Sequence, residues 1–341
     1  MMRLLIGLAL LALALMLTLH QVRQQWEAPL VMPSEGLLLQ VKRGDSLQSL
    51  SNRLVEEGVL DSPLLLRAYG RWTGLDQQIK RGEYRLYPPL TANGLLQALV
   101  SGKVISYQVT LPEGITLEQA VALLSRADPL ERVLAGADDP RLLALSDDNR
   151  SPEGMFLPES YRYEKGDSDW DILQRAHSAM QQALAAEWAQ RVDGLPYESP
   201  YDALIMASIV ERETGVPEER PEIAGVFVRR LLKGMRLQTD PTVIYGLGES
   251  FDGNLRRVHL KDANNPYNSY RHHGLPPTPI ALPGRAAINA ALNPADGDSL
   301  FFVAKGDGSH TFSSNLEDHE RAVRKYQLQR RTDYRSSPSG E

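Results

Sequence analysis

The chain has 341 residues, of which 42% are hydrophobic and 23% charged, and its formal net charge is −6. This length allows one core, but two or three smaller units are the better expectation. The modestly acidic charge gives no indication of a nucleic-acid-binding surface. The chain contains no cysteine, which excludes structural disulfides, cysteine zinc sites and thiol nucleophiles.

The N-terminus carries an apolar run from Leu4 to Leu19, interrupted only by Thr18 and preceded by Arg3. Such a run is either a secretory signal peptide or an uncleaved anchor. No pair of small residues marks a cleavage site after the run, and Trp26 is suited to a membrane–water interface. We therefore expect residues 1–27 to form an uncleaved single-pass membrane anchor, with the remainder of the chain exported.

A Pro- and Gly-containing linker over residues 28–36 precedes a region, 37–150, of short strands and helices. Turn residues and caps divide this region. The expected elements are a strand from residue 37, a helix capped by Asp45 or Ser46, a helix from Pro63 to Trp72, a strand over 82–86, a helix over 95–100, a strand over 104–111 and a helix capped by Thr116.

One pattern occurs twice in this region. The string VKRGDSLQSL at Val41–Leu50 parallels LPEGITLEQA at Leu111–Ala120, with Gly44 matching Gly114. The first copy resembles LysM, a small peptidoglycan-binding module with a βααβ fold. The same spacing is also common wherever a glycine turn leads into a capped helix. The module therefore either contacts glycan or only positions the following unit.

A second unit is expected over residues 151–328, followed by a polar tail over 329–341. Near its start, Glu153 in EGMFLPESYRY either lines a cleft or caps a turn. An amphipathic helix over about 169–192 then presents an apolar stripe typical of a core. The expected fold class is α+β: an N-terminal membrane helix, a small mixed module and a helix-rich unit with a short sheet.

The most informative helix runs from Pro200 to about Glu213. Ser199 can cap it, and no charged residue occurs from Ala203 to Val210, which indicates a buried helix. Glu211 then follows in the last turn. Apolar surroundings and the negative end of the helix would both raise the pKa of this carboxyl, as a general acid requires. The alternative is a carboxylate at the solvated end of the helix.

Two later segments carry further candidate residues. A turn before another helix contains Gln238, Thr239 and Asp240, with Asp240 either capping that helix or lining a cleft. Residues 264–284 lack periodicity and are rich in proline, which suggests a rigid wall. Its tyrosine rings and amide suit sugar binding, and the residues concerned are Tyr267, Asn268 and Tyr270.

Several of these strings together resemble the YceG-like family of endolytic murein transglycosylases. They are ASIVERETG (207–215), GMRLQTDPTVIYG (234–246), NPYNSY (265–270), GLPPTPIALPG (274–284) and HTFSSNLEDH (310–319). The resemblance covers about residues 35–325 and is specific over 150–320. It implies that Glu211 is the catalytic acid.

The resemblance also implies a reaction. Glu211 protonates the β-1,4 bond between N-acetylmuramic acid and N-acetylglucosamine, and then takes a proton from the C6 hydroxyl, which closes a 1,6-anhydro ring. No metal and no cofactor are needed. The implied partners are peptidoglycan strands, the membrane through the N-terminal helix, and penicillin-binding synthases near which growing strands are terminated; the implied location is the inner membrane, with the catalytic unit in the periplasm.

Two other functions stay open at this point. A conventional muramidase would need a second carboxylate, for which Asp240, Glu213 and Asp262 are the candidates. A non-catalytic glycan-binding scaffold would act through the LysM-like module. Products with anhydro ends would distinguish the transglycosylase from a muramidase, whose products have reducing ends. Loss of function in Glu211→Gln would distinguish the transglycosylase from a scaffold.

Overall fold

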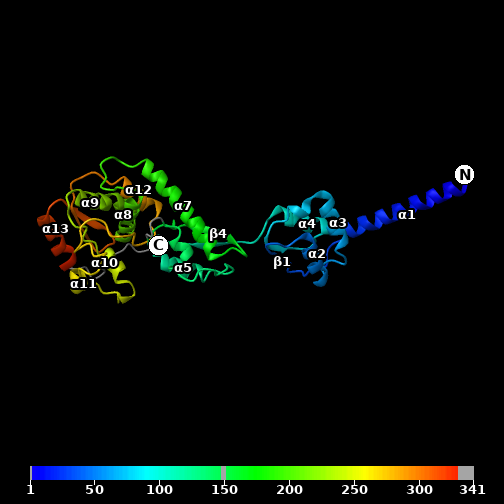
Figure 1. The fold of residues 1–341 in the computed structure, drawn as a ribbon, viewed down its shortest axis with the longest axis horizontal. Coiled ribbons are helices and arrows are strands. Elements are labelled where there is room, and N and C mark those ends of the chain that lie inside the picture. The colour runs from blue at the N-terminus through cyan, green and yellow to red at the C-terminus, as the bar shows by residue number, and fades with distance from the viewer. Residues whose placement is uncertain (1, 147–150, 329–341) are drawn as a thin grey trace. The chain divides into compact units, whose positions relative to one another are not determined.

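The computed structural model describes residues 2–146 and 151–328 (Figure 1), so the expected polar tail over 329–341 lies outside the described residues. The chain forms two compact units. The N-terminal unit comprises Met1–Gln108, Asp128–Glu131 and Arg162–Asp167, and the C-terminal unit comprises Val109–Ala127, Arg132–Tyr161 and Ser168–Glu341.

This division differs from the boundary expected near Ser151 because the segment after residue 109 is bonded into the C-terminal unit. The Leu111 amide donates to the carbonyl of Glu159, at 3.0 Å. Leu282 exchanges backbone hydrogen bonds with Gly114 and Ile115, at 2.9 and 2.7 Å. The second copy of the repeated pattern therefore belongs to the C-terminal unit.

The chain begins with helix α1 (Met2–Glu27), which projects from the N-terminal unit (Figure 1). Over Ile6–Glu27, 22 residues with a mean hydropathy of 1.7 are long and apolar enough to cross a membrane, and the apolar part of this stretch is not buried. Within the described part of the chain it is the one helix that meets this criterion.

The N-terminal unit is built on two antiparallel strands, β1 (Leu37–Val41) and β2 (Gly82–Leu86), in register from Leu37 opposite Leu86 to Val41 opposite Gly82. Between them lie α2 (Leu47–Glu56), α3 (Leu64–Thr73) and the 3₁₀ turn η1 (Leu75–Gln77), and α4 (Ala92–Ser101) follows. Leucines of the helices and Tyr84 of β2 fill the core. The kinship of this unit with LysM stays a prediction.

The C-terminal unit is mostly helical. Its elements are α5 (Leu117–Leu124), α6 (Pro140–Leu143), α7 (Asp169–Ala189), α8 (Pro200–Glu213), η3 (Pro217–Glu219), α9 (Arg220–Leu232), α10 (Asp240–Leu247), η4 (Gly248–Ser250), α11 (Arg257–Lys261), α12 (Arg285–Leu292), the antiparallel pair β5 (Phe301–Ala304) and β6 (His310–Ser313), α13 (Leu316–Val323) and η5 (Arg324–Leu328). The chain passes between the units within β3 (Ser106–Thr110) and β4 (Ser160–Glu164), which pair with each other. The expected α+β class is confirmed.

Helix α8 is the centre of the C-terminal unit, with α7, α9, α10 and α12 packed around it (Figure 1). All eight residues from Ala203 to Val210 are buried, as their apolar run predicts. A helix buried on every side has a fixed rotation and position, because each face packs against a different neighbour. The last turn of α8, which contains Glu211, follows directly on this buried run.

Candidate active site

The N-terminus of α8 is fixed by a capping box. The Ser199 hydroxyl accepts from the Asp202 amide, the Asp202 carboxylate accepts from the Ser199 amide, and Pro200 takes the first helical position. The run of buried residues that follows carries Glu211 into the interior. The side chain of Glu211 is only 4% exposed, so it is not at the solvated end of the helix.

Each oxygen of the Glu211 carboxyl has a partner. Oε1 lies 3.1 Å from Nη2 of Arg220, and Oε2 accepts from the Gly284 amide at 2.9 Å. Burial raises the pKa of Glu211, whereas the Gly284 hydrogen bond and the Arg220 charge act in the opposite direction, and the net shift is upward. The carboxyl is thus held in one orientation, and it binds its proton more tightly than the carboxyl of an ordinary glutamate does.

A second carboxylate, Glu113, shares the same arginine. Its Oε2 lies 3.3 Å from Nη2 of Arg220, the atom that also binds Glu211. Glu113 is half exposed whereas the Arg220 side chain is only 10% exposed. The Glu113 charge is one of the causes that raise the pKa of Glu211. Arg220 Nε is buried and has no hydrogen-bond partner among the described residues, whereas Nη2 contacts both carboxylates.

Neither Glu113 nor Arg220 is among the candidate residues that the sequence indicates. Glu113 stands just before the glycine of the second repeat copy, and Arg220 begins α9. The one available signal was the departure of the second copy from the first, where Arg43 occupies the position of Glu113. A change of charge sign within an otherwise similar pattern can mark a position with a separate task.

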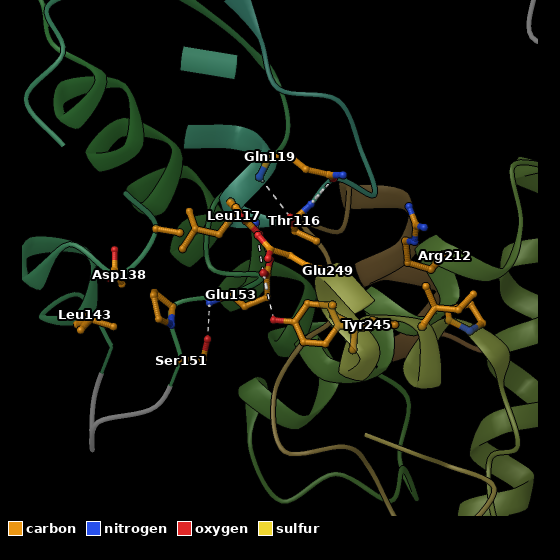
Figure 2. Close-up of a pocket in the computed structure, with 17 residues that line it drawn as sticks. Thr116, Leu117, Gln119, Asp138, Leu143, Ser151, Glu153, Arg212, Tyr245 and Glu249 are labelled. Atoms are coloured by element: carbon orange, nitrogen blue, oxygen red, sulfur yellow. Dashed lines mark hydrogen bonds between the residues drawn. The ribbon is translucent and has the colours of Figure 1, made fainter. Parts of the chain in front are cut away.

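Beside this carboxylate pair, the C-terminal unit contains a cleft of about 900 Å³, shown in Figure 2. Its lining includes Thr116, Gln119, Arg212, Tyr245 and Glu249. Arg212 connects the cleft with the Glu211 site, since it follows Glu211 in the chain and its Nη1 donates to the carbonyl of Gly114 at 2.9 Å. Glu211 itself is not among the lining residues.

Glu153 also lines the cleft but is 5% exposed. Its two oxygens accept from the Leu117 amide at 3.0 and 3.2 Å, and one accepts from the Tyr245 hydroxyl at 3.2 Å (Figure 2). Burial is the main cause that raises the pKa of Glu153 to about 7. These contacts join the start of α5 to α10 at the wall of the cleft.

The turn before α10 has an unusual backbone. Gln238 has a φ of 52°, and its amide donates to the carbonyl of Ser269 at 3.2 Å. The next residue, Thr239, is 2% exposed; its amide donates to the Ser269 hydroxyl at 3.0 Å and its own hydroxyl to Glu213. Burial raises the pKa of Glu213 to about 7. A residue strained into the left-handed region is kept there only by such surrounding contacts.

Asp240 was expected either to cap the following helix or to line a cleft. It is the first residue of α10, and Thr239 occupies the cap position. Thr239 has the extended backbone angles usual at a cap position, with φ −118° and ψ 128°, but its side chain makes no capping hydrogen bond. The Asp240 carboxylate instead accepts from the Tyr270 hydroxyl at 2.7 Å.

The segment 265–270 braces the turn before α10. Asn268 is fully buried, and its amide nitrogen donates to the carbonyls of His259 and Asp262, at 3.1 and 2.6 Å. Tyr267 is partly buried, with its hydroxyl 2.9 Å from that of Thr278. Ser269 and Tyr270 bond Thr239 and Asp240, so the structure brings the expected residues of the two segments together.

These features define a class of site: a helix-borne, buried carboxyl with a raised pKa, oriented by an arginine and a backbone amide beside a cleft, as general acid–base catalysis requires. The sequence profile of the YceG-like family matches residues 39–325. The chain belongs to the YceG-like family.

Named relatives extend this comparison. The chain is 29% identical over 308 residues to the endolytic murein transglycosylase of Bacillus subtilis, covering 84% of each chain. It is 27% identical over 317 residues to that of Streptococcus pneumoniae strain D39, covering 83% of this chain but 57% of the relative. The crystal structure of a YceG-like protein from Listeria monocytogenes superimposes with a TM-score of 0.54 and 29% identity, over 85% of this chain and 99% of that one.

Proposed function

We propose that this protein is a membrane-anchored lytic transglycosylase that cuts within peptidoglycan glycan strands, with Glu211 as its catalytic acid. The observation that carries the proposal is the environment of Glu211: a 4% exposed carboxyl with a raised pKa, held by Arg220 and the Gly284 amide. Relatives named endolytic murein transglycosylase support the substrate class.

The reaction uses Glu211 twice. Protonated Glu211 gives its proton to the oxygen that bridges C1 of N-acetylmuramic acid and C4 of N-acetylglucosamine, and the C1–O bond breaks. The substrate's own acetamide stabilises the cation at C1. Ionised Glu211 then removes the proton of the C6 hydroxyl, whose oxygen bonds to C1 and forms the 1,6-anhydro ring. The carboxyl regains its proton, and no water is consumed.

Arg220 and Glu113 are positioning residues in this scheme. When Glu211 has given up its proton, the guanidinium of Arg220 stabilises the carboxylate from 3.1 Å. Glu113 holds the same guanidinium nitrogen and opposes its effect on the pKa of Glu211. Burial is the main cause that keeps the pKa of Glu211 above its ordinary value, and the Glu113 charge adds to it while the Arg220 charge acts against it. The carboxyl therefore accepts a proton more readily than an ordinary glutamate and is stabilised by Arg220 once the proton has left.

The cleft and the segments around it are the proposed binding site for the sugars. Thr116, Gln119 and Arg212 offer donors and acceptors along the cleft, and Glu153 and Tyr245 form its wall. The remaining predicted contacts are Gln238, Asp240, Tyr267 and Tyr270. Thr239 and Asn268 are both buried, at 2% and 0% exposure, and are assigned to bracing this region.

The location and partners belong to the same proposal. α1 crosses the inner membrane once and places the rest of the chain in the periplasm, near the penicillin-binding synthases whose growing strands it terminates. The length and composition of α1 support the anchor.

The test is mass spectrometry of glycan fragments that the full chain releases from peptidoglycan. Wild type should give fragments one water lighter than hydrolysis products. Glu211→Gln should lower their rate of release by about 10²–10⁴-fold, the usual contribution of a general acid. Glu218→Gln, which alters an exposed glutamate in η3 nearby, is the matched control and should retain activity.

Two results would contradict the proposal. Fragments with reducing ends would identify a muramidase with a second carboxylate. Binding of glycan without release by either wild type or Glu211→Gln would indicate a scaffold.

A further inference from the structure

The end of α1 is fixed to α3 by aromatic contacts within the N-terminal unit. The rings of Trp26 and Tyr69 have centroids 4.4 Å apart, and Tyr69 and Trp72 are 6.2 Å apart in an edge-on arrangement. Trp26 also packs against the hydrophobic core of this unit. The last turn of α1 is therefore part of the unit, and α3 lies beside it (Figure 1).

One face of α3 is apolar and open to solvent. Leu64 is 68% exposed and Trp72 is 83% exposed, and Ala68 between them is also exposed. Their spacing of four residues places them in one row along the helix. A tryptophan exposed to this degree loses most of the burial that its ring could gain. This row, Leu64–Ala68–Trp72, is called the α3 face below.

The two flanks of the α3 face differ in character. Leu65 and Tyr69 are one position further round the helix, and both border α1. The Tyr69 ring contacts the Trp26 ring in a tilted arrangement, and Leu65 lines a groove of about 130 Å³ together with Trp26 and Val31. On the opposite flank lie Arg67 and Arg71. Val31 is itself 72% exposed. Apolar surface thus continues from the end of α1 to the α3 face and ends at two arginines.

We propose that the α3 face lies in the headgroup layer of the membrane that α1 crosses, with Trp72 among the upper acyl chains and Arg67 and Arg71 on lipid phosphates. This inference rests on the proposed anchor. The apolar run Leu4–Leu19 is about 24 Å long in a helix, so the edge of a hydrocarbon core about 30 Å thick falls within the next few residues and the mostly polar residues up to Glu27 lie in the headgroup layer. Trp26 is among those last residues, and the α3 face adjoins it.

The chemistry of the face favours lipid as the occupant. Tryptophan and arginine are typical of the membrane interface, where the indole ring spans the apolar and wet layers and arginine meets phosphate. Leu64 and Val31 add aliphatic side chains that have nothing polar to offer a sugar or a protein hydrogen-bond network. A helix with an apolar row flanked by basic residues is the usual form of an interfacial helix.

This docking would give the N-terminal unit two attachments to the membrane instead of one. A single helix leaves the unit free to tilt about its junction. A second contact through α3 fixes the tilt of the N-terminal unit, and hence the height above the lipid at which it holds β1 and β2.

The experiment is fluorescence quenching by brominated lipids, with the full chain reconstituted into vesicles of phosphatidylcholine and phosphatidylglycerol. The chain has four tryptophans. Three variants, each retaining one of them with the others changed to phenylalanine, report on Trp26, Trp72 and Trp188 separately. We expect bromine near the headgroup to quench Trp72 to an extent comparable with Trp26, and to leave Trp188, in α7 of the C-terminal unit, unquenched.

The outcomes separate this inference from the anchor on which it rests. Quenching of Trp26 without quenching of Trp72 would overturn docking of the α3 face and leave the anchor in place. Absence of quenching for both would overturn the anchor as well. An unquenched Trp72 with blue-shifted emission would mean that a protein surface covers the face instead of lipid, which also overturns the inference.

A second measurement tests the two arginines. In the variant that retains only Trp72, Arg67→Gln with Arg71→Gln should reduce the quenching of Trp72 in vesicles containing phosphatidylglycerol, and not in phosphatidylcholine alone. The matched control is Arg43→Gln, an exposed arginine in the turn before α2. An equal reduction in the control would overturn the assignment of these two arginines to lipid phosphate.

Discussion

The two copies of the repeated pattern, Val41–Leu50 and Leu111–Ala120, have the same local structure and different surroundings. In each, a glycine with positive φ is followed by a complete capping box, at Ser46 in the first copy and Thr116 in the second. The local sequence therefore determines the turn and the start of the helix in both units.

The difference lies in what the glycine turn approaches. A Cβ added at Gly44 would meet nothing within 4 Å, whereas one at Gly114 would contact Arg212 and, at 3.8 Å, Cγ of Glu211. The residue before the glycine is the exposed Arg43 in the first copy and Glu113, bound to Arg220, in the second. One turn of backbone thus serves as simple scaffold in one unit and carries part of the candidate site in the other.

The largest expected difference between the two copies comes from replacing the charged residue before each glycine by glutamine. Glu113→Gln should lower kcat/KM by about 10-fold, a fraction of the total that a general acid contributes, whereas Arg43→Gln should leave activity unchanged. The Glu113 charge helps to raise the pKa of Glu211, so its removal lowers that pKa. Because the acid must start protonated, activity should be lost at lower pH than in wild type.

Arg220→Gln is the complementary change. Arg220 lowers the pKa of Glu211, so its removal should move the loss of activity at high pH to higher pH, although the maximum rate falls because the carboxyl loses its orientation. Rates of fragment release, measured from about pH 5 to pH 9, record both shifts of the pH profile. If both variants move the profile in the same direction, the opposing roles of Glu113 and Arg220 are wrong.

A smaller effect on activity is expected from alanine at the two glycines. Both Gly44→Ala and Gly114→Ala place a side chain at positive φ, which costs about 1–2 kcal/mol of stability in each unit. Only Gly114→Ala should also lower activity several-fold, because relaxation of its turn moves Glu113 and the carbonyl that binds Arg212. Denaturant unfolding and fragment release, measured on the same preparations, test this. Equal loss of activity in the two variants would contradict it.

The smallest expected effect is on the caps. Ser46→Ala and Thr116→Ala each remove one side-chain acceptor from the start of a helix, which should lower the free energy of unfolding of the respective unit by about 1 kcal/mol. The two losses should agree, since both capping boxes are complete. Urea titration of each variant provides the values. A much larger loss for Thr116→Ala would mean that its bond network extends beyond the cap.

The sequence predicts best where the determinants are local. The cap at Ser199 and the uncharged run to Val210 suffice to identify α8 as a buried helix. They leave open whether Glu211 in its last turn is buried or solvated, which the structure decides through the 4% exposure of its side chain. Caps and glycines likewise place α2 and α5. Boundaries shift by a residue or more where two neighbours can serve, as at Thr239 and Asp240.

The parts that the sequence did not indicate depend on distant contacts. Glu113 gains its importance from Arg220, 107 residues later, and no periodicity within either segment records that pairing. Asn268 has the residue type of a sugar ligand, but the path of the chain buries it against two backbone carbonyls. Residue type suggests what a side chain can do, and tertiary packing decides whether it is available.

The residues that form the Glu211 site are far apart in the sequence, and this determines when the site can form during synthesis of the chain. Arg220 follows Glu211 by nine residues, Gly284 follows it by 73, and Glu113 precedes Arg220 by 107. Until residue 284 has been synthesised and the C-terminal unit has closed, the carboxyl stands in water, where it ionises as an ordinary glutamate and cannot serve as an acid at neutral pH. A nascent or partly folded chain therefore lacks the acid, and the lytic activity begins only with the completed fold.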